Sequence, residues 1–480
     1  MSTHRTETDV RPIIVWFRQD LRLADNPALS EALKIGEVIP LYILDDITPG
    51  SWTLGGASRW WLHNSLRSLA ADLEARGSKL ILRKGSAGAV IASLAVETNA
   101  KAVYWNRLYE PYSILRDAQI KATLAENQIS AQSFNASLLA EPWTVKTGND
   151  GPYKVFTPFW RSLSSRFVNE PLILTPKELR APTVWPHNDD LHAWNLLPSK
   201  PNWAKGFADA WRPGEHGARQ AMITFLDTAL DGYATNRDRP DMAGTSRLSP
   251  HLHWGEIGPR QVWSAIETSV NRDNGVEKHA SKFLAEIGWR EFSYNLLYHY
   301  PHITERNLNP AFDQFPWMDS DTRFKAWSHG RTGYPIVDAG MRELWATGYM
   351  HNRVRMIVAS FLVKHLLIPW QRGARWFWDT LVDADLANNS ASWQWVAGSG
   401  ADAAPFFRIF NPIIQGEKFD PDGSYVRKWV PELAAIDARY IHRPWTAPNF
   451  GSLEYCPPIV DHAQARSTAL DAFKMCSPNS

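Results

Sequence analysis

Residues 13–44 read IIVWFRQDLRLADNPALSEALKIGEVIPLYIL, and this stretch indicates the architecture of the first part of the chain. It contains an apolar run at 13–17, a helical pattern at 26–34 and a second apolar run at 38–44. Short runs rich in Ile and Val predict buried strands, and Asp25 or Asn26 can cap the intervening helix. The stretch therefore predicts a strand–helix–strand unit of the kind found in parallel α/β sheets.

The same alternation continues along the next hundred residues. Strands are expected at 80–83 and 102–105, and helices at 57–76 and 87–98. Residues 11–140 are thus predicted to form a doubly wound parallel-sheet α/β domain. The first strand runs into WFRQDLR rather than G-x-G-x-x-G, so a dinucleotide-binding Rossmann site is not expected there, although a ligand could still bind beyond the strand ends.

The chain changes character after residue 140. Residues 141–213 hold 10 of the 32 prolines and few periodic apolar runs, which predicts a long, semi-rigid connection over the surface. From residue 214 to 480 strand patterns nearly vanish, and an all-helical C-terminal domain is predicted. The helical periodicity covers residues 220–230, 260–270, 280–300, 337–345, 352–366 and 374–381.

Composition excludes several classes of protein. The formal net charge is +1, so any nucleic-acid binding must come from a local basic patch. Two cysteines, Cys456 and Cys476, are too few for a disulfide framework or a thiolate metal cluster. The start is polar and no apolar stretch is long enough to cross a bilayer, so a cytoplasmic protein without membrane contact is expected.

Six segments stand out, in this order along the chain: WFRQDLRLADNPAL (16–29), GTSRLSP (244–250), FLAEIGWREF (283–292), TGYPIVDAGMRELWATGYMHNRVRM (332–356), DADLANNSASWQW (383–395) and FRIFNP (407–412). Together they resemble the photolyase/cryptochrome family. The resemblance covers about residues 11–445, and it implies an antenna-binding α/β domain followed by a helical FAD-binding catalytic domain.

The resemblance implies a set of FAD-binding residues in the helical domain. A Ser/Thr-rich loop would hold the phosphates, Tyr233 would help to cover the cofactor, and an Arg355–Asp383 ion pair would lie beside the isoalloxazine ring. An isolated loop of this kind is more often an ordinary N-capping turn, and a buried Arg–Asp pair can be purely structural. The remaining residues matched to FAD are Thr245, Ser246, Arg247, Leu248, Ser249, Asn352, Asp385 and Asn389.

Asn389 matches the family position that faces flavin N5. Photolyases have Asn there, whereas plant cryptochromes tend to carry Asp and some insect cryptochromes Cys. An amide can accept from a protonated N5 or donate to a deprotonated one.

Trp393, Trp370 and Trp317 match the family's electron-supplying tryptophan triad. Trp376 and Trp378 could offer a side branch, but core packing is the favoured interpretation of these two.

The resemblance also indicates the substrate. Glu286 and Trp289 are at i and i+3, on one face of a helix. Glu286 matches the acid that hydrogen-bonds a flipped pyrimidine dimer and stabilises its added negative charge. Trp289 and Trp395 match aromatic walls of that pocket. Asn352 and Met356 occupy two places where six-four photolyases carry histidines, which favours cyclobutane dimers as the substrate.

Contacts with dimer-containing DNA are implied for four basic residues, although solvated surface charge is the alternative for each. They are Arg237, Arg353, Arg408 and Lys418.

His251 and His253 are interpreted as loop and helix-start residues. We expect no metal, because no further ligand cluster accompanies them.

A second chromophore is implied for the α/β domain. Tyr112 and Ser113 stand where the best-known folate site has an Asn–Glu pair. The PLYILDD (40–46) and GGASRWWLHNSLRSL (55–69) segments are closer to class III photolyases. We expect 5,10-methenyltetrahydrofolate, with an 8-hydroxy-deazaflavin as the alternative.

The function implied by the resemblance is light-dependent repair of cyclobutane pyrimidine dimers in DNA by a monomeric photo-lyase. Excited reduced FAD would donate an electron to the dimer, and flipping would be helped because damaged bases pair poorly. A cryptochrome photoreceptor is the main alternative, because it would share FAD and the tryptophan triad. A dark flavin oxidoreductase is the third, but no motif offers the substrate-facing acid or thiol that it needs.

Overall fold

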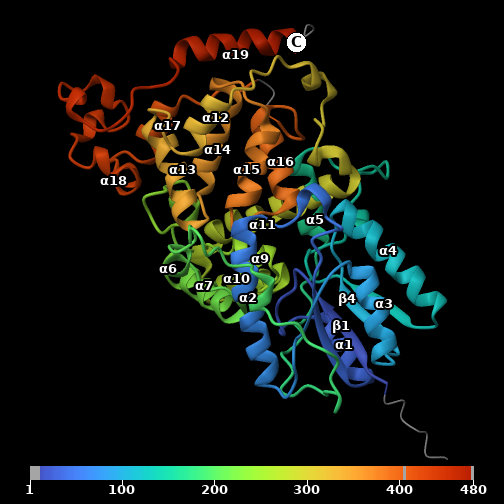
Figure 1. Ribbon diagram of the computed structural model, residues 1–480. Coiled ribbons are helices and arrows are strands. Elements are labelled where there is room, and N and C mark those ends of the chain that lie inside the picture. The colour runs from blue at the N-terminus through green and yellow to red at the C-terminus, as the bar shows by residue number, and fades with distance from the viewer. Residues whose placement is uncertain (1–10, 404–406, 477–480) are drawn as a thin grey trace, which may run out of the picture.

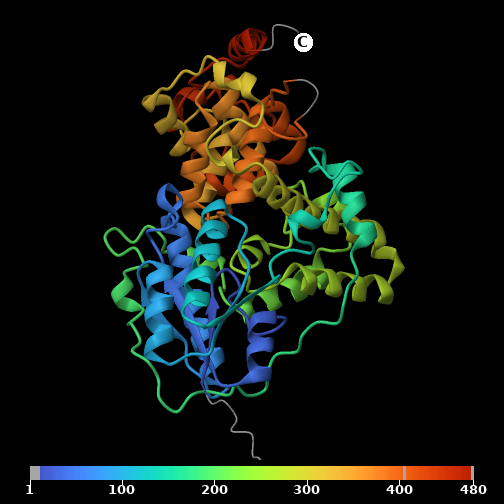
Figure 2. The same cartoon turned by 90° about the vertical axis from the view of Figure 1, so that its right-hand side faces the viewer.

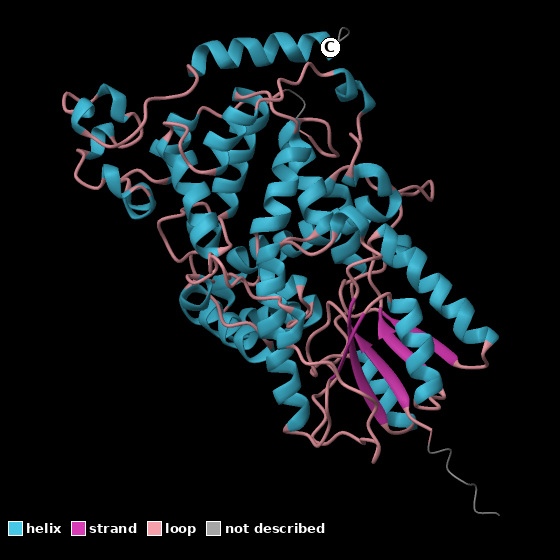
Figure 3. Cartoon of the chain, in the orientation of Figure 1, coloured by secondary structure: helices cyan, strands magenta, loops and turns pink. Residues whose placement is uncertain are grey.

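The structure is a computed structural model that describes residues 11–403 and 407–476 (Figure 1). In the described residues one small sheet lies toward one end of the molecule with helices beside it, and the other end consists of helices joined by loops (Figure 3). This is the predicted order of an α/β part followed by an all-α part. No helix in the described ranges is both long and apolar enough to cross a membrane.

The sheet has five parallel strands in the order β3-β2-β1-β4-β5. Its central strand β1 places Trp16 opposite Leu41 on one side and Trp105 on the other. Apolar side chains of β1 alternate between two separate cores, which explains why its run is apolar at every position. The strands are β1 (Ile13–Phe17), β2 (Val38–Leu44), β3 (Ile81–Lys84), β4 (Ala102–Asn106) and β5 (Ser130–Phe134).

Helices cover both faces of this sheet. Leu29 of α1 and Leu66 of α2 pack on one face, and Ile91 of α3 and Ile120 of α4 pack on the other. Asn26 caps α1 by accepting from the amide of Leu29, as its sequence position predicted. The helices are α1 (Pro27–Ile35), α2 (Gly56–Glu74), α3 (Ala87–Glu97) and α4 (Pro111–Glu126).

Residues 167–206 run along the outside of the α/β part without an α-helix (Figure 2). Backbone hydrogen bonds fix this segment to the sheet end, including Val38 to Arg180 at 2.7 Å and Leu179 to Arg76 at 3.0 Å. The segment 141–213, which was expected only to connect, also contains two α-helices and two 3₁₀ turns. Helix α5 (Phe156–Arg166) packs against α11 (Glu277–His299) and so belongs to the helical part.

The helical part contains every helix that its periodicity predicted, with bounds shifted by a few residues. One prediction is wrong in detail: the helix expected at 352–366 is α-helical only as α14 (Asn352–Ser360) and continues as a π-helical turn, η7 (Phe361–His365). The other helices are α6 (Phe207–Ala210), α7 (Glu215–Thr228), α8 (Tyr233–Asn236), α9 (Ser249–His253), α10 (Pro259–Arg272), α12 (Asp321–Ser328), α13 (Pro335–Thr347), α15 (Trp370–Thr380), α16 (Leu386–Ala397), α17 (Pro412–Phe419), α18 (Ser424–Trp429) and α19 (His462–Cys476). Short 3₁₀ turns lie at η1 (Gly50–Trp52), η2 (Pro142–Thr144), η3 (His192–Trp194), η4 (Asn274–Val276), η5 (Pro301–Thr304), η6 (Pro310–Gln314), η8 (Pro431–Leu433), η9 (Ala438–Tyr440), η10 (Pro444–Thr446) and η11 (Phe450–Ser452).

Buried polar groups join the α/β part to the helical part. The carboxylate of Glu256 accepts from the indole of Trp61 at 3.0 Å and from the amide of Gly214 at 2.7 Å, and it contacts His251 at 2.5 Å. The guanidinium of Arg22 donates to four backbone carbonyls, including that of Gly255. Such satisfied buried networks fix the relative position of the two parts.

Candidate functional site

The residues expected to bind FAD lie on elements that pack together. Helix α11 contacts both α8 and α16, and α14 contacts α16. These contacts bring segments that are more than 100 residues apart in sequence into one region of the helical part. The structure therefore brings the residues of the expected FAD site into one region, although these residues were predicted from short motifs that are separate in the sequence.

Arg355 and Asp383 form the predicted ion pair. Nη2 of Arg355 lies 2.8 and 3.1 Å from the two oxygens of Asp383, and its Nε donates to the carbonyl of Met350. Burial works against the charge of Arg355, but the Asp383 carboxylate more than offsets this and raises the pKa of the guanidinium. A fixed charged pair of this kind can set the electrostatic environment of a bound ring.

The loop before α9 adopts a constrained conformation. Arg247 has φ 53°, in the left-handed region, and its guanidinium carbon lies 4.2 Å from the Trp211 ring centroid and 4.8 Å from that of Tyr349. The hydroxyl of Ser246 accepts from the amide of Leu248 at 3.3 Å. A loop of hydroxyls and amides beside a cation is suited to phosphate. Thr245 is half-buried, Leu248 buried and Ser249 exposed.

Trp211 and Tyr349 were not predicted as site residues. The sequence signal was weak, because each looks like ordinary core packing until Arg247 is placed between them. Tyr349 also lies 5.2 Å from the guanidinium carbon of Arg355. Tyr233, which was predicted, is buried against Phe225 and Phe283.

Asp385 caps the start of α16 by accepting from the amide of Asn388 at 2.8 Å. Its other oxygen accepts from the hydroxyl of Tyr294 at 2.5 Å and lies 3.4 Å from Nδ1 of His253. Burial opposes ionisation of Asp385, but His253 and Tyr294 together hold its pKa below the usual range. Asp385 is therefore a fixed anion.

The interpretation of His251 and His253 needs correction. Both lie in the short helix α9 and are buried, where they contact Glu256 and Asp385 respectively. Their expected place at a helix start agrees with α9, but they are partners of buried carboxylates rather than loop residues. In the ranges that the structure describes, no group of His, Cys, Asp and Glu is arranged to hold a metal.

Asn389 lies one turn into α16 and is buried. Its Nδ2 donates to the carbonyl of Ala374 on α15 at 3.0 Å. No hydrogen bond to its Oδ1 is formed within the described part of the chain, so this oxygen remains an acceptor. The orientation fits an amide that accepts a hydrogen bond from a ligand in the site.

The three tryptophans of the expected triad range from buried to partly exposed. Trp393 and Trp370 are buried, and Trp317 is half-buried with its ring centroid 4.4 Å from Phe315. The indole of Trp370 donates to Asn307 at 2.9 Å. Trp393 packs directly on α15, where a Cβ on Gly373 would come within 2.1 Å of its ring.

A second series of rings leads away from Trp393. Trp327 lies 6.3 Å from Trp393, and Phe324 bridges Trp327 and Trp376 with centroid distances of 5.6 and 6.2 Å. Trp376 is stacked on Trp345 at 6.2 Å, and Trp345 is 49% exposed. Trp376 therefore belongs to a series that reaches the surface.

Trp378 has different surroundings. Its indole donates to the carbonyl of Thr53, and its ring packs against Trp52 at 5.3 Å. The favoured core-packing interpretation fits Trp378, and Trp376 also packs against the core while it contacts the exposed Trp345.

Glu286 is paired in this structure. Its carboxylate accepts from the guanidinium of Arg237, and Lys282 lies 3.7 Å away on the same helix. Burial works against the charge of Arg237, but its hydrogen bond with Glu286 raises the pKa of the guanidinium. Arg237 was expected to contact DNA phosphate, and the structure adds this direct contact with the predicted substrate acid.

Trp289 is stacked face to face on Phe156. Their centroids are 3.8 Å apart with an interplanar angle of 8°. Phe156 is the first residue of α5, in the segment that was expected only to connect the two domains. It was missed because the contact joins residues 133 positions apart in a chain with many aromatics.

The start of α14 is linked to this group. Arg353 forms an ion pair with Asp238 at 2.9 Å, and its Nη1 lies 3.7 Å from the sulfur of Met356. Asp238 is also 3.8 Å from Arg237. Asn352 is exposed and Met356 half-buried. Two of the predicted DNA-contacting arginines therefore converge on Asp238, which the sequence analysis did not identify.

The other two basic residues are exposed. Nζ of Lys418 and the guanidinium carbon of Arg353 both lie over the ring of Phe419, at 5.2 and 4.5 Å from its centroid. Arg408 lies over Phe410 and lines a different cavity together with Trp395. The indole of Trp395 donates to the carbonyl of Asp402 at 3.0 Å.

Comparison with known proteins agrees with this geometry. A family model described as "DNA photolyase" matches residues 13–180, and one described as "FAD binding domain of DNA photolyase" matches residues 283–475. Deoxyribodipyrimidine photo-lyase of Agrobacterium fabrum is 51% identical over 96% of this chain and 97% of its own length. Cryptochrome-1 of Arabidopsis thaliana is 41% identical over 94% of this chain and 69% of its own length.

Among solved structures, this chain is similar to the crystal structure of a bacterial class III photolyase from Agrobacterium tumefaciens. The match covers 100% of this chain and 100% of that protein's chain. It has a TM-score of 0.94 and 50% sequence identity. With an FAD-binding domain matched in sequence and the whole fold matched in structure, the chain belongs to the DNA photolyase family.

Proposed function

We propose that this protein is a photo-lyase that repairs cyclobutane pyrimidine dimers in DNA under blue light. The observation that carries the proposal is the connected series Glu286–Arg237–Asp238–Arg353–Met356. It links a carboxylate on the face of α11 to two phosphate-binding candidates and to the start of α14. A lesion held by Glu286 and a backbone held by the arginines would then be bound as one unit.

The residues present fit FAD. Thr245, Ser246 and Arg247 offer hydroxyl and cationic partners for its phosphates, and the Arg355–Asp383 pair and Asn389 Oδ1 offer partners for its ring. When bound, reduced and excited by light, FAD supplies the electron that opens the cyclobutane ring. The protein itself has to orient the cofactor and exclude water from it.

The lesion pocket would use Glu286 and Trp289 on adjacent turns of α11. Glu286 would hydrogen-bond the flipped dimer, and Trp289 would stack on it with Phe156 behind the indole. Asn352 and Met356 carry no titratable group, so the pocket supplies no imidazole for proton transfer at those positions. This argues for cyclobutane dimers over six-four photoproducts.

The α/β part would hold the antenna, which we propose is 5,10-methenyltetrahydrofolate. The class III character of residues 40–46 and 55–69 supports the folate. Acid extraction of the purified protein followed by mass spectrometry tests this. Recovery of an 8-hydroxy-deazaflavin in place of the pterin would overturn the assignment.

A blue-light photoreceptor is the alternative, and the repair assay separates the two functions. Photoreduced protein is mixed with an oligothymidylate that contains cyclobutane dimers, and recovery of thymine absorbance is followed under blue light. A dark sample and a Glu286→Ala variant are the controls. Light-dependent recovery that the variant slows supports repair, whereas no recovery by a protein with reducible FAD would favour the photoreceptor.

A further inference from the structure

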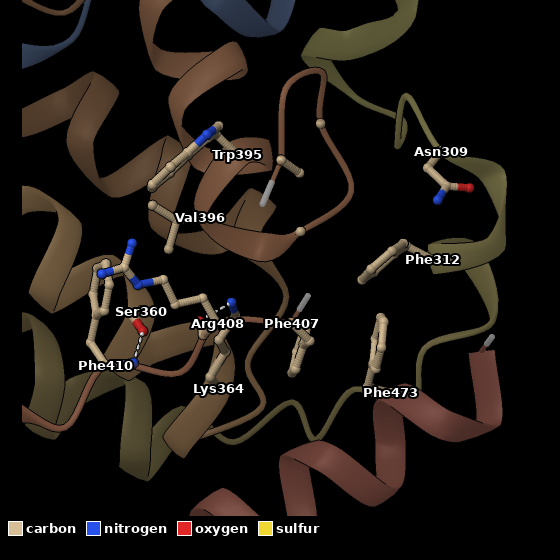
Figure 4. A pocket seen from close by; sticks show the side chains of 13 residues that line it. Asn309, Phe312, Ser360, Lys364, Trp395, Val396, Phe407, Arg408, Phe410 and Phe473 are labelled. Atoms are coloured by element: carbon tan, nitrogen blue, oxygen red, sulfur yellow. Dashed lines mark hydrogen bonds between the residues drawn. The ribbon is translucent and has the colours of Figure 1, made fainter. Parts of the chain in front are cut away.

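A cavity of about 300 Å³ lies between α16, η7 and the C-terminal helix α19 (Figure 4). Its lining includes Trp395, Lys364, Arg408, Phe312, Phe407 and Phe473. Glu286, Trp289 and Met356 do not line it, but it shares Trp395 with the expected lesion pocket. The volume is at the lower end of the range for small-molecule pockets.

The cavity contains a buried cation without an anionic partner. Lys364 is 3% exposed, and its Nζ donates to the carbonyl of Arg408 at 2.5 Å. Among residues 11–403 and 407–476, Lys364 forms no ion pair with a carboxylate, and the charged group that acts on it is Arg408. Burial lowers the pKa of this lysine to about 7, and the charge of Arg408 adds to the effect. An unpaired buried charge is costly, and an anion in the cavity would compensate it.

One side of the cavity is formed by aromatic rings. Phe407 and Phe473 are stacked with centroids 4.6 Å apart at 8°, and Phe312 lies 6.0 Å from Phe473. Figure 4 shows these three rings on one side of the cavity, with Arg408 and Trp395 on the other. Every type of nucleobase can stack on such rings, and lysine and arginine side chains bind phosphate.

We propose that this cavity binds one unpaired nucleotide of the strand opposite the lesion, with its base on the aromatic side and its phosphate at Lys364 and Arg408. The inference rests on the proposed function. When a dimer leaves the duplex, the bases that faced it lose their partners. A second pocket that shares Trp395 with the lesion pocket is placed to take one of them.

The test is dark binding of dimer-containing DNA by fluorescence anisotropy, with three substrates. One is a duplex with both opposite bases present, one has abasic sites opposite the dimer, and one is the damaged single strand. Lys364→Met removes the charge and keeps the length of the side chain. We expect it to weaken binding of the complete duplex about tenfold, as for loss of one charge-assisted hydrogen bond. Binding of the single strand, which has no opposite nucleotide, should be unchanged. The abasic duplex keeps the phosphate but lacks the base that would stack in the cavity, so its binding should be weakened less than that of the complete duplex.

Two controls accompany this comparison. Lys84→Met removes an exposed charge at the end of β3 and should leave all three affinities unchanged. Phe473→Leu removes one aromatic ring without touching a charge, and should weaken only the complete duplex, by a few-fold. If Lys364→Met does not fold, Phe473→Leu carries the same test.

Several outcomes would overturn the inference. An equal loss on all three substrates would mean that Lys364 acts through the fold or through general charge. Equal wild-type affinity for the complete and abasic duplexes would mean that no opposite base is bound. A rise in melting temperature with free dAMP that depends on Lys364, without any effect of abasic sites, would assign the cavity to a free mononucleotide. Failure of the wild type to bind any damaged DNA would instead contradict the proposed function.

Discussion

The guanidinium of Arg237 donates directly to the carboxylate of Glu286. One residue matches a DNA-phosphate contact and the other the acid that recognises the dimer, so the two roles are coupled before DNA arrives. Arg237 also lies over the Tyr233 ring, 5.6 Å from its centroid, beside the expected flavin site. In the proposed function, lesion recognition, backbone binding and the cofactor pocket would therefore meet at the side chain of Arg237.

Replacement of Glu286 by Ala should slow repair about tenfold, because a lost hydrogen bond to a charged group is worth about 1.5 kcal/mol or more. It also frees Arg237, so dark binding to undamaged DNA should not weaken. The measurement is thymine absorbance recovered per absorbed photon. Glu277→Ala, at the exposed start of the same helix, is the matched control and should repair normally. Equal rates for both variants would remove Glu286 from the lesion pocket.

Phe156 is predicted to fix the orientation of Trp289. Loss of this stacked ring in Phe156→Ala should raise the dissociation constant for a dimer-containing oligonucleotide several-fold, since an aromatic pair contributes about 0.5–1.5 kcal/mol beyond its buried area. Fluorescence anisotropy in the dark measures this effect. Phe324→Ala removes a ring elsewhere in the helical part and should leave the dissociation constant unchanged. Unchanged affinity in Phe156→Ala would show that Trp289 is held by other contacts.

The sequence predicted local structure well and contacts between distant segments poorly. The apolar runs of β1 and β2 were located to the residue because both faces of these strands are buried. Strand β5 (SAQSF) was missed, because an edge strand with no fully buried residue carries no such pattern. Helix α4 was missed in a similar way, since only four of its residues are buried.

For the site, the residue list and one pairing came from the family resemblance, and the other pairings came from the structure. Arg355 and Asp383 were expected to pair, and they do. The contacts of Arg237 with Glu286, Phe156 with Trp289 and Arg353 with Asp238 could not be predicted, because each joins segments whose separation in space depends on the complete helical packing.

The expected tryptophan triad and the second series of rings predict two routes for photoreduction of FAD. Trp370→Phe should slow the route through Trp317, and Trp376→Phe the route through Trp345, because phenylalanine is much harder to oxidise than tryptophan. Each single variant should therefore retain part of the rate, and the double variant should lose nearly all of it. The flavin absorbance under blue light with an external reductant gives the rate. Trp378→Phe is the control, because its ring packs against Trp52 away from both series. The second route would be excluded if Trp376→Phe left the rate of photoreduction unchanged both in the wild type and in the Trp370→Phe variant.

The attachment of α19 is predicted to be acid-sensitive. Nε2 of His365 and Nδ1 of His462 lie 2.9 Å apart, and their hydrogen bond needs an unprotonated nitrogen on one of the two rings, so it is lost when both histidines are protonated. Burial, with the nearby His462, lowers the pKa of His365 to about 3. Burial also lowers the pKa of His462.

The sign of the effect follows from the proton balance. An unfolded histidine binds a proton near pH 6.5, whereas folded His365 does so only near pH 3, so below about pH 6.5 the unfolded state holds more protons. The free energy of unfolding should therefore fall by about 1.4 kcal/mol from pH 7.5 to 5.5 through His365 alone. Urea unfolding of wild type and His365→Gln at both pH values isolates this contribution, because glutamine does not titrate. The fall in the free energy of unfolding between pH 7.5 and 5.5 should be smaller in His365→Gln than in the wild type. It should equal that of the wild type in His187→Gln, which alters an exposed histidine. An equal drop in all three proteins would place the acid sensitivity elsewhere in the fold.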